Sequence, residues 1–410
     1  MITPTVSAID ENKVIVIGLD GADWDIITPL VNEGKLPNIE KLMKNGDYAN
    51  LTSTIPSMSP VAWTTFATGK NPGKHGIYSF LEKRGNEFVP LSSQDIESKK
   101  IWDITSENDL SSIIINVPMT YPPHKIKGKI ISGYLSIRNT TYTYPKNLQK
   151  RIEKMDYEIE ALSRRFEPSM KNEFLENLNH TVDMRTKVAL DLLEGGNWNL
   201  FTIVYTGLDR LQHYFWKYSK NDKNKHTNSI EKHYIKLDSQ IGKLLKKTDK
   251  DTYVIILSDH GFSRLNGEVY VNYWLRKEGY LKLKKDRNIL GKIGITQQKL
   301  VSWMKNVGIY RPLKLLLKRL GIYKLSNTIP KPSLDDIDFN KTKAFAGNFG
   351  GQIYITTEDY DKIRKELKDK LENLKNPKTG KKFFDVVHKK EEIYEGDMLH
   401  KAPDLVIDSE

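Results

Sequence analysis

Four short apolar runs constrain the fold of this chain more than any other feature of its sequence. They are rich in β-branched residues and read KVIVIGL (13–19), SSIIINV (111–117), NLFTIVY (199–205) and TYVIILS (252–258). Runs of this kind predict strands that are buried on both faces. Helical patterns separate them, at 24–33, 38–45, 145–154 and about 171–193. The alternation predicts an α/β protein with a mostly parallel sheet sandwiched by helices.

Acidic residues and histidines follow three of these runs directly. Asp20 ends the first, Asp209 follows the third with His213 four residues later, and Asp259 and His260 follow the fourth in the stretch LSDHGF. The carboxyl ends of parallel strands meet at one edge of a sheet, where chemistry gathers. Carboxylates and imidazoles are ligands of divalent metal ions. The sequence therefore predicts a metal centre at this edge.

Each of these residues also has a structural interpretation. Asp20 could be the N-cap of the next helix, His213 could pack on an aromatic helix face, and the Asp259–His260 pair could cap a helix or close a hairpin. However, Asp209 and His213 are spaced i, i+4, which places them on one helix face where both can reach one ion. Their joint occurrence favours the metal centre. The chain contains no cysteine, so any metal must be held by oxygen and imidazole nitrogen.

A fourth segment, TIPSMSPVAWTTFATGKNPGKHGI (54–77), supplies a candidate nucleophile. We expect it to form another strand end, with Ser59 as the N-cap of a helix and Pro60 in the first turn. This arrangement would direct the free N–H groups of the helix N-terminus at the group that the hydroxyl attacks. It is a favourable position for a nucleophile that faces a phosphate.

Four motifs together, GLDGADW, PSMSPVAWTTFATGKNPGKHGI, TGLDRLQH and LSDHGF, make the chain resemble the alkaline phosphatase superfamily, in its type I phosphodiesterase/nucleotide pyrophosphatase branch. The resemblance extends from Val14 to Val406 and implies an alkaline-phosphatase-like sheet. It also implies two divalent metal ions, most simply zinc, with manganese or iron as alternatives. The residues that it assigns are Asp20, Asp259 and His260 as ligands of one metal, Asp209 and His213 as ligands of the other, and Ser59 as the catalytic nucleophile that completes the first site.

The register of the nucleophile comes from the Thr68–Gly69 pair, because the family places its nucleophile nine positions before it. This spacing selects Ser59, with Ser57 as the alternative if the loop contains a gap. Nucleotide-cleaving members carry an asparagine three residues after the nucleophile, and Ala62 stands there instead. The resemblance therefore does not imply a nucleotide substrate.

The family completes its second metal site with a histidine near the C-terminus. His400 and His388 are the candidates in this chain, and neither lies in the expected histidine-glycine context. The alternative is a residue beyond Glu410 in a longer chain. His75, in NPGKHGI, is expected to tie down the loop after the nucleophile helix, with support of the metal site as the less favoured role.

The motifs predict a metal-dependent phosphoric ester hydrolase that works through a phosphoseryl intermediate. Its substrate would be a phosphorylated small molecule, or a lipid or glycan phosphate. One alternative is a phosphotransferase or mutase of the same superfamily. Another is a non-catalytic or membrane-surface binding protein with an incomplete second metal site.

The net charge of +12 is concentrated in one part of the chain. Residues 281–330 hold twelve Lys and Arg against a single acid, Asp286. We therefore predict a catalytic core at 1–265 and 340–410 and a basic helical cap at 266–339. The cap's charge favours a solvated face, or peripheral contact of 281–330 with an anionic membrane, and no nucleic-acid partner is expected. No signal peptide or membrane span is evident in the sequence, so we expect a cytoplasmic protein.

Overall fold

The structure is a computed structural model that describes residues 13–134, 136–137, 140–160, 170–219, 226–284, 334–347, 351–377 and 379–408. The chain divides into two compact units. The first takes the described residues of Met1–Glu82, Val89–Glu268 and Lys389–Ala402, and the second those of Lys83–Phe88, Val269–His388 and Pro403–Glu410.

A six-stranded sheet in the order β6-β5-β4-β7-β1-β8 forms the centre of the first unit. All neighbouring pairs are parallel except β5 and β6. The three strands that precede the candidate ligands lie side by side, since β1 pairs with β7 on one side and with β8 on the other. The strands are β1 (Val14–Leu19), β4 (Ser112–Ile115), β5 (Gly128–Ile131), β6 (Thr143–Tyr144), β7 (Leu200–Tyr205) and β8 (Tyr253–Leu257).

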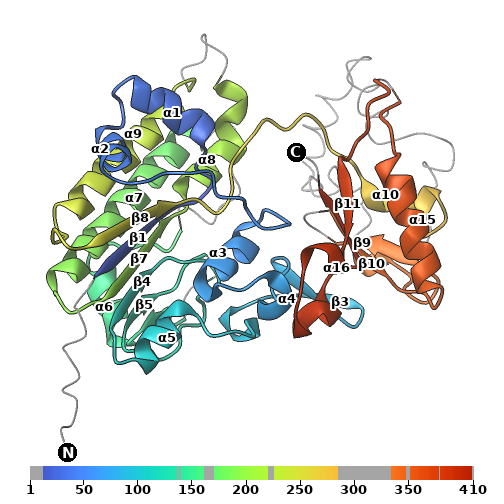
Figure 1. The fold of residues 1–410 in the computed structure, drawn as a ribbon, viewed down its shortest axis with the longest axis horizontal. Helices are drawn as coiled ribbons and strands as arrows, with labels where there is room; N and C mark the ends of the chain where they lie inside the picture. Colours follow the sequence, from blue (N-terminus) through green and yellow to red (C-terminus); the bar gives the residue numbers. More distant parts are fainter. Residues whose placement is uncertain are drawn as a thin grey trace, which may run out of the picture. The chain divides into compact units, whose positions relative to one another are not determined.

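Helices cover both faces of this sheet (Figure 1). The helices of the first unit are α1 (Trp24–Asn32), α2 (Pro37–Asn45), α3 (Ser59–Thr68), α4 (Pro72–His75), α5 (Ile101–Glu107), α6 (Asn147–Glu153), α7 (Lys171–Glu194), α8 (Gly207–Phe215), α9 (Ser229–Leu245) and α16 (Lys390–Ile393). A short hairpin is formed by β2 (Leu81–Arg84) and β3 (Glu87–Pro90). The predicted α/β class, the four predicted strands and the four predicted helices are confirmed.

Side chains along β1 alternate between the two faces. Ile15 and Ile17 enter the core under α1, α2, α7, α8 and α9, whereas Val16 enters the core under α3 and α5. On the α3 side, Gly18 leaves room for the fully buried Trp63, because a Cβ at Gly18 would lie 2.3 Å from Trp63 Cη2. The strand and the nucleophile helix therefore meet at very close range.

Two details of the predicted sheet are wrong. Strand β8 is not buried on both faces, since Tyr253 is 62% exposed and Ile255 is 46% exposed. The reason is its position at the end of the sheet, where β1 is its only neighbour among the described strands. Residues 46–58, which lead into α3, form no strand, so Ser59 does not follow a strand end.

The second unit has its own sheet, in the order β11-β12-β10-β9, and its own core. Its elements are α10 (Val271–Lys277), β9 (Ala344–Ala346), β10 (Gln352–Ile355), α15 (Tyr360–Glu372), β11 (Val386–Lys389) and β12 (Leu405–Asp408). Residues 344–388 thus pack with 269–284 around this sheet, whereas the sequence grouped 340–410 with the core. The boundaries of the cap remain a prediction, because 285–333 lie outside the described residues.

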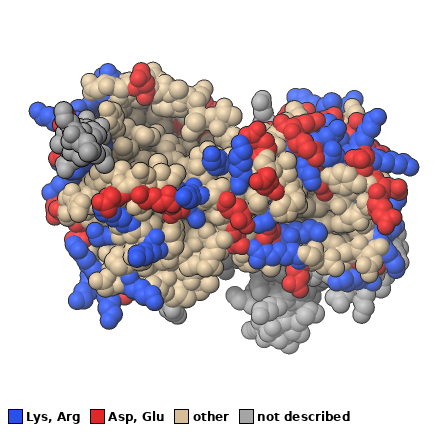
Figure 2. Space-filling view, turned by 60° about the horizontal axis from the view of Figure 1, so that its bottom comes forward, with Lys and Arg blue, Asp and Glu red and all other residues tan. Residues whose placement is uncertain are grey.

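Charges of both signs are interspersed over the described surface drawn in Figure 2. Most of the predicted basic surface at 281–330 lies outside the described residues, so its contact with an anionic membrane remains a prediction. Within the part of the chain that is described, no helix combines the length and the apolar character needed to cross a membrane.

Candidate metal centre

The candidate ligands lie directly after their strands, as the motifs predict. Asp20 follows β1, Asp209 lies in the first turn of α8 just after β7, and Asp259 and His260 follow β8. The backbone fixes two of them to each other, because the N–H of Asp209 donates to the carbonyl of Asp20 at 3.1 Å. The N–H of Gly21 also donates to Asp259 Oδ1 at 3.2 Å. The loops after three neighbouring strands are thereby held in one arrangement.

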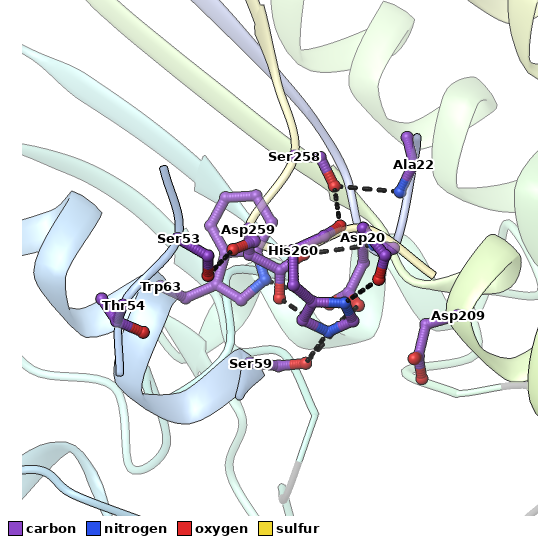
Figure 3. A network of polar contacts seen from close by, with 12 residues as sticks. Asp20, Ala22, Ser53, Thr54, Ser59, Trp63, Asp209, Ser258, Asp259 and His260 are labelled. Carbon is purple, nitrogen blue, oxygen red and sulfur yellow. Dashed lines mark hydrogen bonds and ion pairs between the residues drawn. The ribbon is translucent and has the colours of Figure 1, made fainter. Parts of the chain in front are cut away.

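Ligand atoms from Asp20, Asp209 and His260 all lie within 4.8 Å of one another. His260 Nε2 is 3.8 Å from Asp20 Oδ1 and 3.4 Å from Asp259 Oδ2. Figure 3 shows these side chains pointing toward a common space, with Asp209 facing it from α8. His213 lies beside these ligand atoms and contacts Asp209, with its Nε2 3.2 Å from Asp209 Oδ1.

The hydroxyl of Ser59 faces the same group of ligand atoms. Its Oγ is 3.5 Å from Asp20 Oδ1 and 3.3 Å from His260 Nε2 (Figure 3). Ser57 is exposed and makes no such contact. The structure therefore brings Ser59, and not Ser57, to the candidate ligands.

Burial makes this group of carboxylates costly without a cation. Burial raises the pKa of Asp20 well above its ordinary value, and the charges of Asp259 and Asp209 raise it further. Burial also raises the pKa of Asp259, against the lowering effect of His260. Asp259 Oδ2 is a buried oxygen with no hydrogen-bond partner. An unpaired oxygen among buried carboxylates is the environment that a bound divalent ion satisfies, so the residues fit a metal.

The tautomer of His260 suits a metal ligand. Its Nδ1 lies 2.9 Å from the carbonyl oxygen of Gly261, and a carbonyl can only accept, so Nδ1 carries the proton. Nε2, the nitrogen that faces Asp20 and Ser59, is therefore left with its lone pair. A Cβ at position 261 would lie 2.3 Å from Asp23 Oδ2, which accepts the N–H of Phe262, so a larger residue there would displace this carboxylate.

Ser59 is positioned differently from the prediction. Met58 is the N-cap of α3, and Ser59 is its first helical residue. Several free N–H groups were expected at this end, but Val61 and Ala62 both donate to the carbonyl of Met58, and Pro60 has no N–H. Among residues 59–62, the N–H of Ser59 is therefore the one that no described backbone carbonyl accepts. The preceding loop is held by Ser53 Oγ, which donates to the carbonyl of Asp259 at 2.5 Å.

Trp63 is the residue of this site that the motifs did not identify. Its Nε1 donates to Asp20 Oδ2 at 3.0 Å, so one carboxylate oxygen is held by the indole while Oδ1 faces Ser59 and His260. Gly18 of β1, opposite the ring, was a signal in the sequence, because a glycine inside a strand often marks close approach of another group.

We expect Trp63→Phe to weaken divalent metal binding about tenfold, because an outer hydrogen bond that orients a ligand is typically worth that much or more. Competition with a chromogenic zinc chelator measures the change. Trp102→Phe is the matched control, since Trp102 is also fully buried on this face of the sheet and its Nε1 has no partner. Equal losses in both variants would mean that Trp63 only packs.

His75 connects the nucleophile helix to the loop that follows it. Its Nδ1 accepts the N–H of Ile77 at 3.1 Å, so Nε2 carries the proton and donates to Thr65 Oγ1 of α3 at 3.0 Å. The side chain is fully buried, and burial lowers the pKa of His75 to about 4. These contacts support the expected role of tying down the loop.

We expect His75→Leu to lower the free energy of unfolding by about 1–3 kcal/mol at pH 7.5, because it leaves the buried Ile77 N–H without an acceptor. The pKa of His75 is depressed from 6.5 to about 4, so its contribution is present above 6.5 and is lost as the pH falls toward 4. The difference between wild type and variant should therefore shrink at pH 5 in urea unfolding. His180→Leu, at an exposed position of α7, should show neither effect.

The two C-terminal histidines belong to different units. His400 is exposed in the short helix η5 (Asp397–Lys401), where its Nδ1 donates to the carbonyl of Asp397 at 2.9 Å. His388 belongs to the second unit, 3.6 Å from Asp408 Oδ2. His400 is not part of the cluster of described ligand atoms around Asp20, and a ligand role for His388 remains a prediction.

A parallel sheet with aspartates, histidines and a serine at one edge is the arrangement that the resemblance to the alkaline phosphatase superfamily implies. Residues 14–410 match the family model described as "Type I phosphodiesterase / nucleotide pyrophosphatase". The chain belongs to this family. No curated protein sequence matches it.

Solved structures share the fold at low sequence identity. Phosphonoacetate hydrolase from Sinorhizobium meliloti 1021, in complex with phosphonoacetate, is 14% identical with a TM-score of 0.58, and the match covers 98% of this chain and 81% of that one. Murine ectonucleotide pyrophosphatase/phosphodiesterase 5, an inactive variant in complex with AMP, is 14% identical with a TM-score of 0.52, covering 97% and 79%.

Proposed function

We propose that the protein is a metal-dependent hydrolase of phosphoric diesters or phosphonate-like esters, with Ser59 as its nucleophile. The observation that supports this most is the position of Ser59 Oγ, 3.3 Å from His260 Nε2 and 3.5 Å from Asp20 Oδ1, beside a cluster of buried carboxylates. Membership of the type I phosphodiesterase family supports the same reaction class. Asp20, Asp259 and His260 would hold one divalent ion, and Asp209 and His213 a second.

The residues of the chain suggest a two-step reaction. Ser59 Oγ releases its proton to solvent and forms a bond to phosphorus while the bond to the leaving oxygen breaks, and the released alkoxide takes a proton from solvent. A water molecule then attacks the phosphoseryl group and releases a proton, the bond between phosphorus and Ser59 Oγ breaks, and Ser59 Oγ takes up a proton again. Bound divalent ions would lower the pKa of the serine hydroxyl and neutralise charge on the phosphoryl oxygens. Zinc fits carboxylate and imidazole ligands, as do manganese and iron.

Hydrolysis of bis(p-nitrophenyl) phosphate tests this proposal. The protein loaded with zinc or manganese should release p-nitrophenolate, and the protein treated with a chelator should not. No release with either metal would favour a binding protein that has kept the fold. Adding an alcohol acceptor then separates hydrolysis from transfer, because hydrolysis gives p-nitrophenyl phosphate, whereas a phosphotransferase would give the mixed p-nitrophenyl phosphodiester of the added alcohol.

A further inference from the structure

A second cluster of polar side chains lies farther along the same edge of the sheet. Arg210 Nε and Glu160 Oε2 form an ion pair at 2.5 Å. The guanidinium also lies over the ring of Tyr134, with Cζ 5.0 Å from its centroid. All three residues belong to the first unit. Arg210 is the residue after Asp209, so this cluster begins next to the candidate metal centre.

The topology places this cluster on one side of the metal centre. The candidate ligands follow β1, β7 and β8, whereas Tyr134 follows β5, on the far side of β4 from β7 (Figure 1). The charge of Glu160 is close enough to Asp20 to add to its raised pKa. A substrate whose phosphoryl group meets Ser59 would therefore extend toward this cluster if it runs along the edge of the sheet.

A buried arginine holds the cluster in place through hydrogen bonds. Arg185, of which 1% is exposed, donates through Nη2 to the carbonyl of Ile159 at 2.7 Å and through Nη1 to Thr206 Oγ1 at 3.4 Å. Thr206 Oγ1 donates in turn to Glu160 Oε1 at 3.3 Å. These contacts fix the backbone beside Glu160 as well as its carboxylate. Rigid support of this kind is what a binding subsite needs.

Arg210 and Glu160 still have polar groups to offer. Arg210 uses Nε for the ion pair, and its two Nη groups form no hydrogen bond with a described residue; 27% of its side chain is exposed. Glu160 Oε2 is buried and paired with Arg210, whereas Oε1 accepts from Thr206 Oγ1 and keeps a second lone pair for a ligand. The cluster thus offers N–H donors and a carboxylate acceptor side by side, with a net charge close to zero.

We infer that Glu160 and Arg210 form a subsite for a hydroxyl-bearing group of the substrate, such as a glycerol or sugar moiety. A hydroxyl both donates and accepts, so it can pair with a carboxylate and a guanidinium together. A second anionic group fits poorly, because Glu160 neutralises Arg210 and would repel the anion. This inference rests on the proposed function, which supplies the phosphoryl group at Ser59.

Three p-nitrophenyl phosphodiesters test the subsite, because they share one leaving group and differ in the other alcohol, which is glyceryl, ethyl or carboxymethyl. The metal-loaded wild type should show a kcat/KM for the glyceryl ester at least about tenfold above that for the ethyl ester, with the carboxymethyl ester poorest. Glu160→Gln and Arg210→Gln should each reduce the glyceryl-to-ethyl ratio toward one. Glu160→Gln should also improve the carboxymethyl ester relative to the ethyl ester.

The matched control is Glu158→Gln, which removes an exposed carboxylate two residues earlier and should leave all ratios at their wild-type values. A ratio near one in the wild type, or a parallel fall for all three esters in the Glu160 variant, would overturn the subsite. Calorimetry with glycerol 3-phosphate and ethyl phosphate separates the two proposals. Tighter binding of glycerol 3-phosphate without turnover of any ester would retain the subsite and overturn the hydrolase, whereas turnover without this preference would do the reverse.

Discussion

Replacing Ser59 with alanine is expected to reduce turnover of bis(p-nitrophenyl) phosphate by on the order of 10⁴-fold or more, because removal of a nucleophile leaves only the residual rate of the remaining site. Metal binding should persist, because the carboxylates and imidazoles supply most of the ligand atoms. Acid quenching followed by mass spectrometry should detect a phosphate on Ser59 in the wild type and none in the variant.

Ser57→Ala is the matched control for this experiment. It removes a hydroxyl two residues earlier in the same segment, at an exposed position away from the candidate ligands. It should keep nearly full activity. An inactive Ser57 variant together with an active Ser59 variant would place the nucleophile two residues earlier and contradict the geometry at the start of α3.

The strand-end residues of this site could be predicted from the sequence, because the prediction needed only the order of the elements. Once 14–19, 200–205 and 253–257 are parallel strands, Asp20, Asp209 and Asp259 must meet at one edge. In the same way, the i, i+4 spacing of Asp209 and His213 was enough to predict that both lie on one helix face. These inferences depend on local periodicity and on the general geometry of parallel sheets.

Contacts that depend on packing across the sheet could not be predicted. The bond from Trp63 to Asp20 requires the ring to lie against Gly18, and nothing in the local sequence of α3 specifies that orientation. The position of Ser59 was wrong by one residue for a local reason. Serine before proline favours the N-cap, but Val61 and Ala62 both donate to the carbonyl of Met58, which makes Met58 the N-cap.

Two further features could not be predicted because they depend on the tertiary structure. They are the exposed side chains of β8 and the ion pair of Glu160 with Arg210. An apolar run does not say whether its strand lies at the centre or at the end of a sheet, so Tyr253 and Ile255 were expected to be buried. Glu160 and Arg210 are fifty positions apart in the sequence and come together only through the tertiary structure. The spacing of residues within one motif cannot reveal such a pair.

Asp20→Asn is expected to abolish turnover and to change the way in which stability depends on metal and pH. In the metal-free protein, burial and the neighbouring carboxylates raise the pKa of Asp20 above its unfolded value. A raised folded pKa means that stability is greatest below the unfolded pKa and is lost as the pH rises through the folded pKa. The metal-free wild type should therefore lose stability as the pH rises above about 4, the ordinary value for an aspartate.

A bound ion should reverse this trend, because it replaces the protons that the carboxylates would otherwise take up. Saturation with zinc at about 100 times Kd should add about 2.7 kcal/mol to the free energy of unfolding. Without metal, Asp20→Asn should unfold at a higher temperature than the wild type at pH 8, since one buried charge is gone. With zinc the order should invert, because the variant has lost a ligand.

Thermal unfolding of the wild type and of Asp20→Asn, each with and without zinc at pH 5 and at pH 8, measures these differences. Asp249→Asn is the matched control, because it removes the same charge from an exposed position beside Lys13 and should respond to zinc like the wild type. If the metal-free Asp20 variant were no more stable than the wild type at pH 8, the buried carboxylates would not be in mutual repulsion. If zinc stabilised the Asp20 variant as much as the wild type, Asp20 would not be a ligand, and the metal centre would have to lie elsewhere.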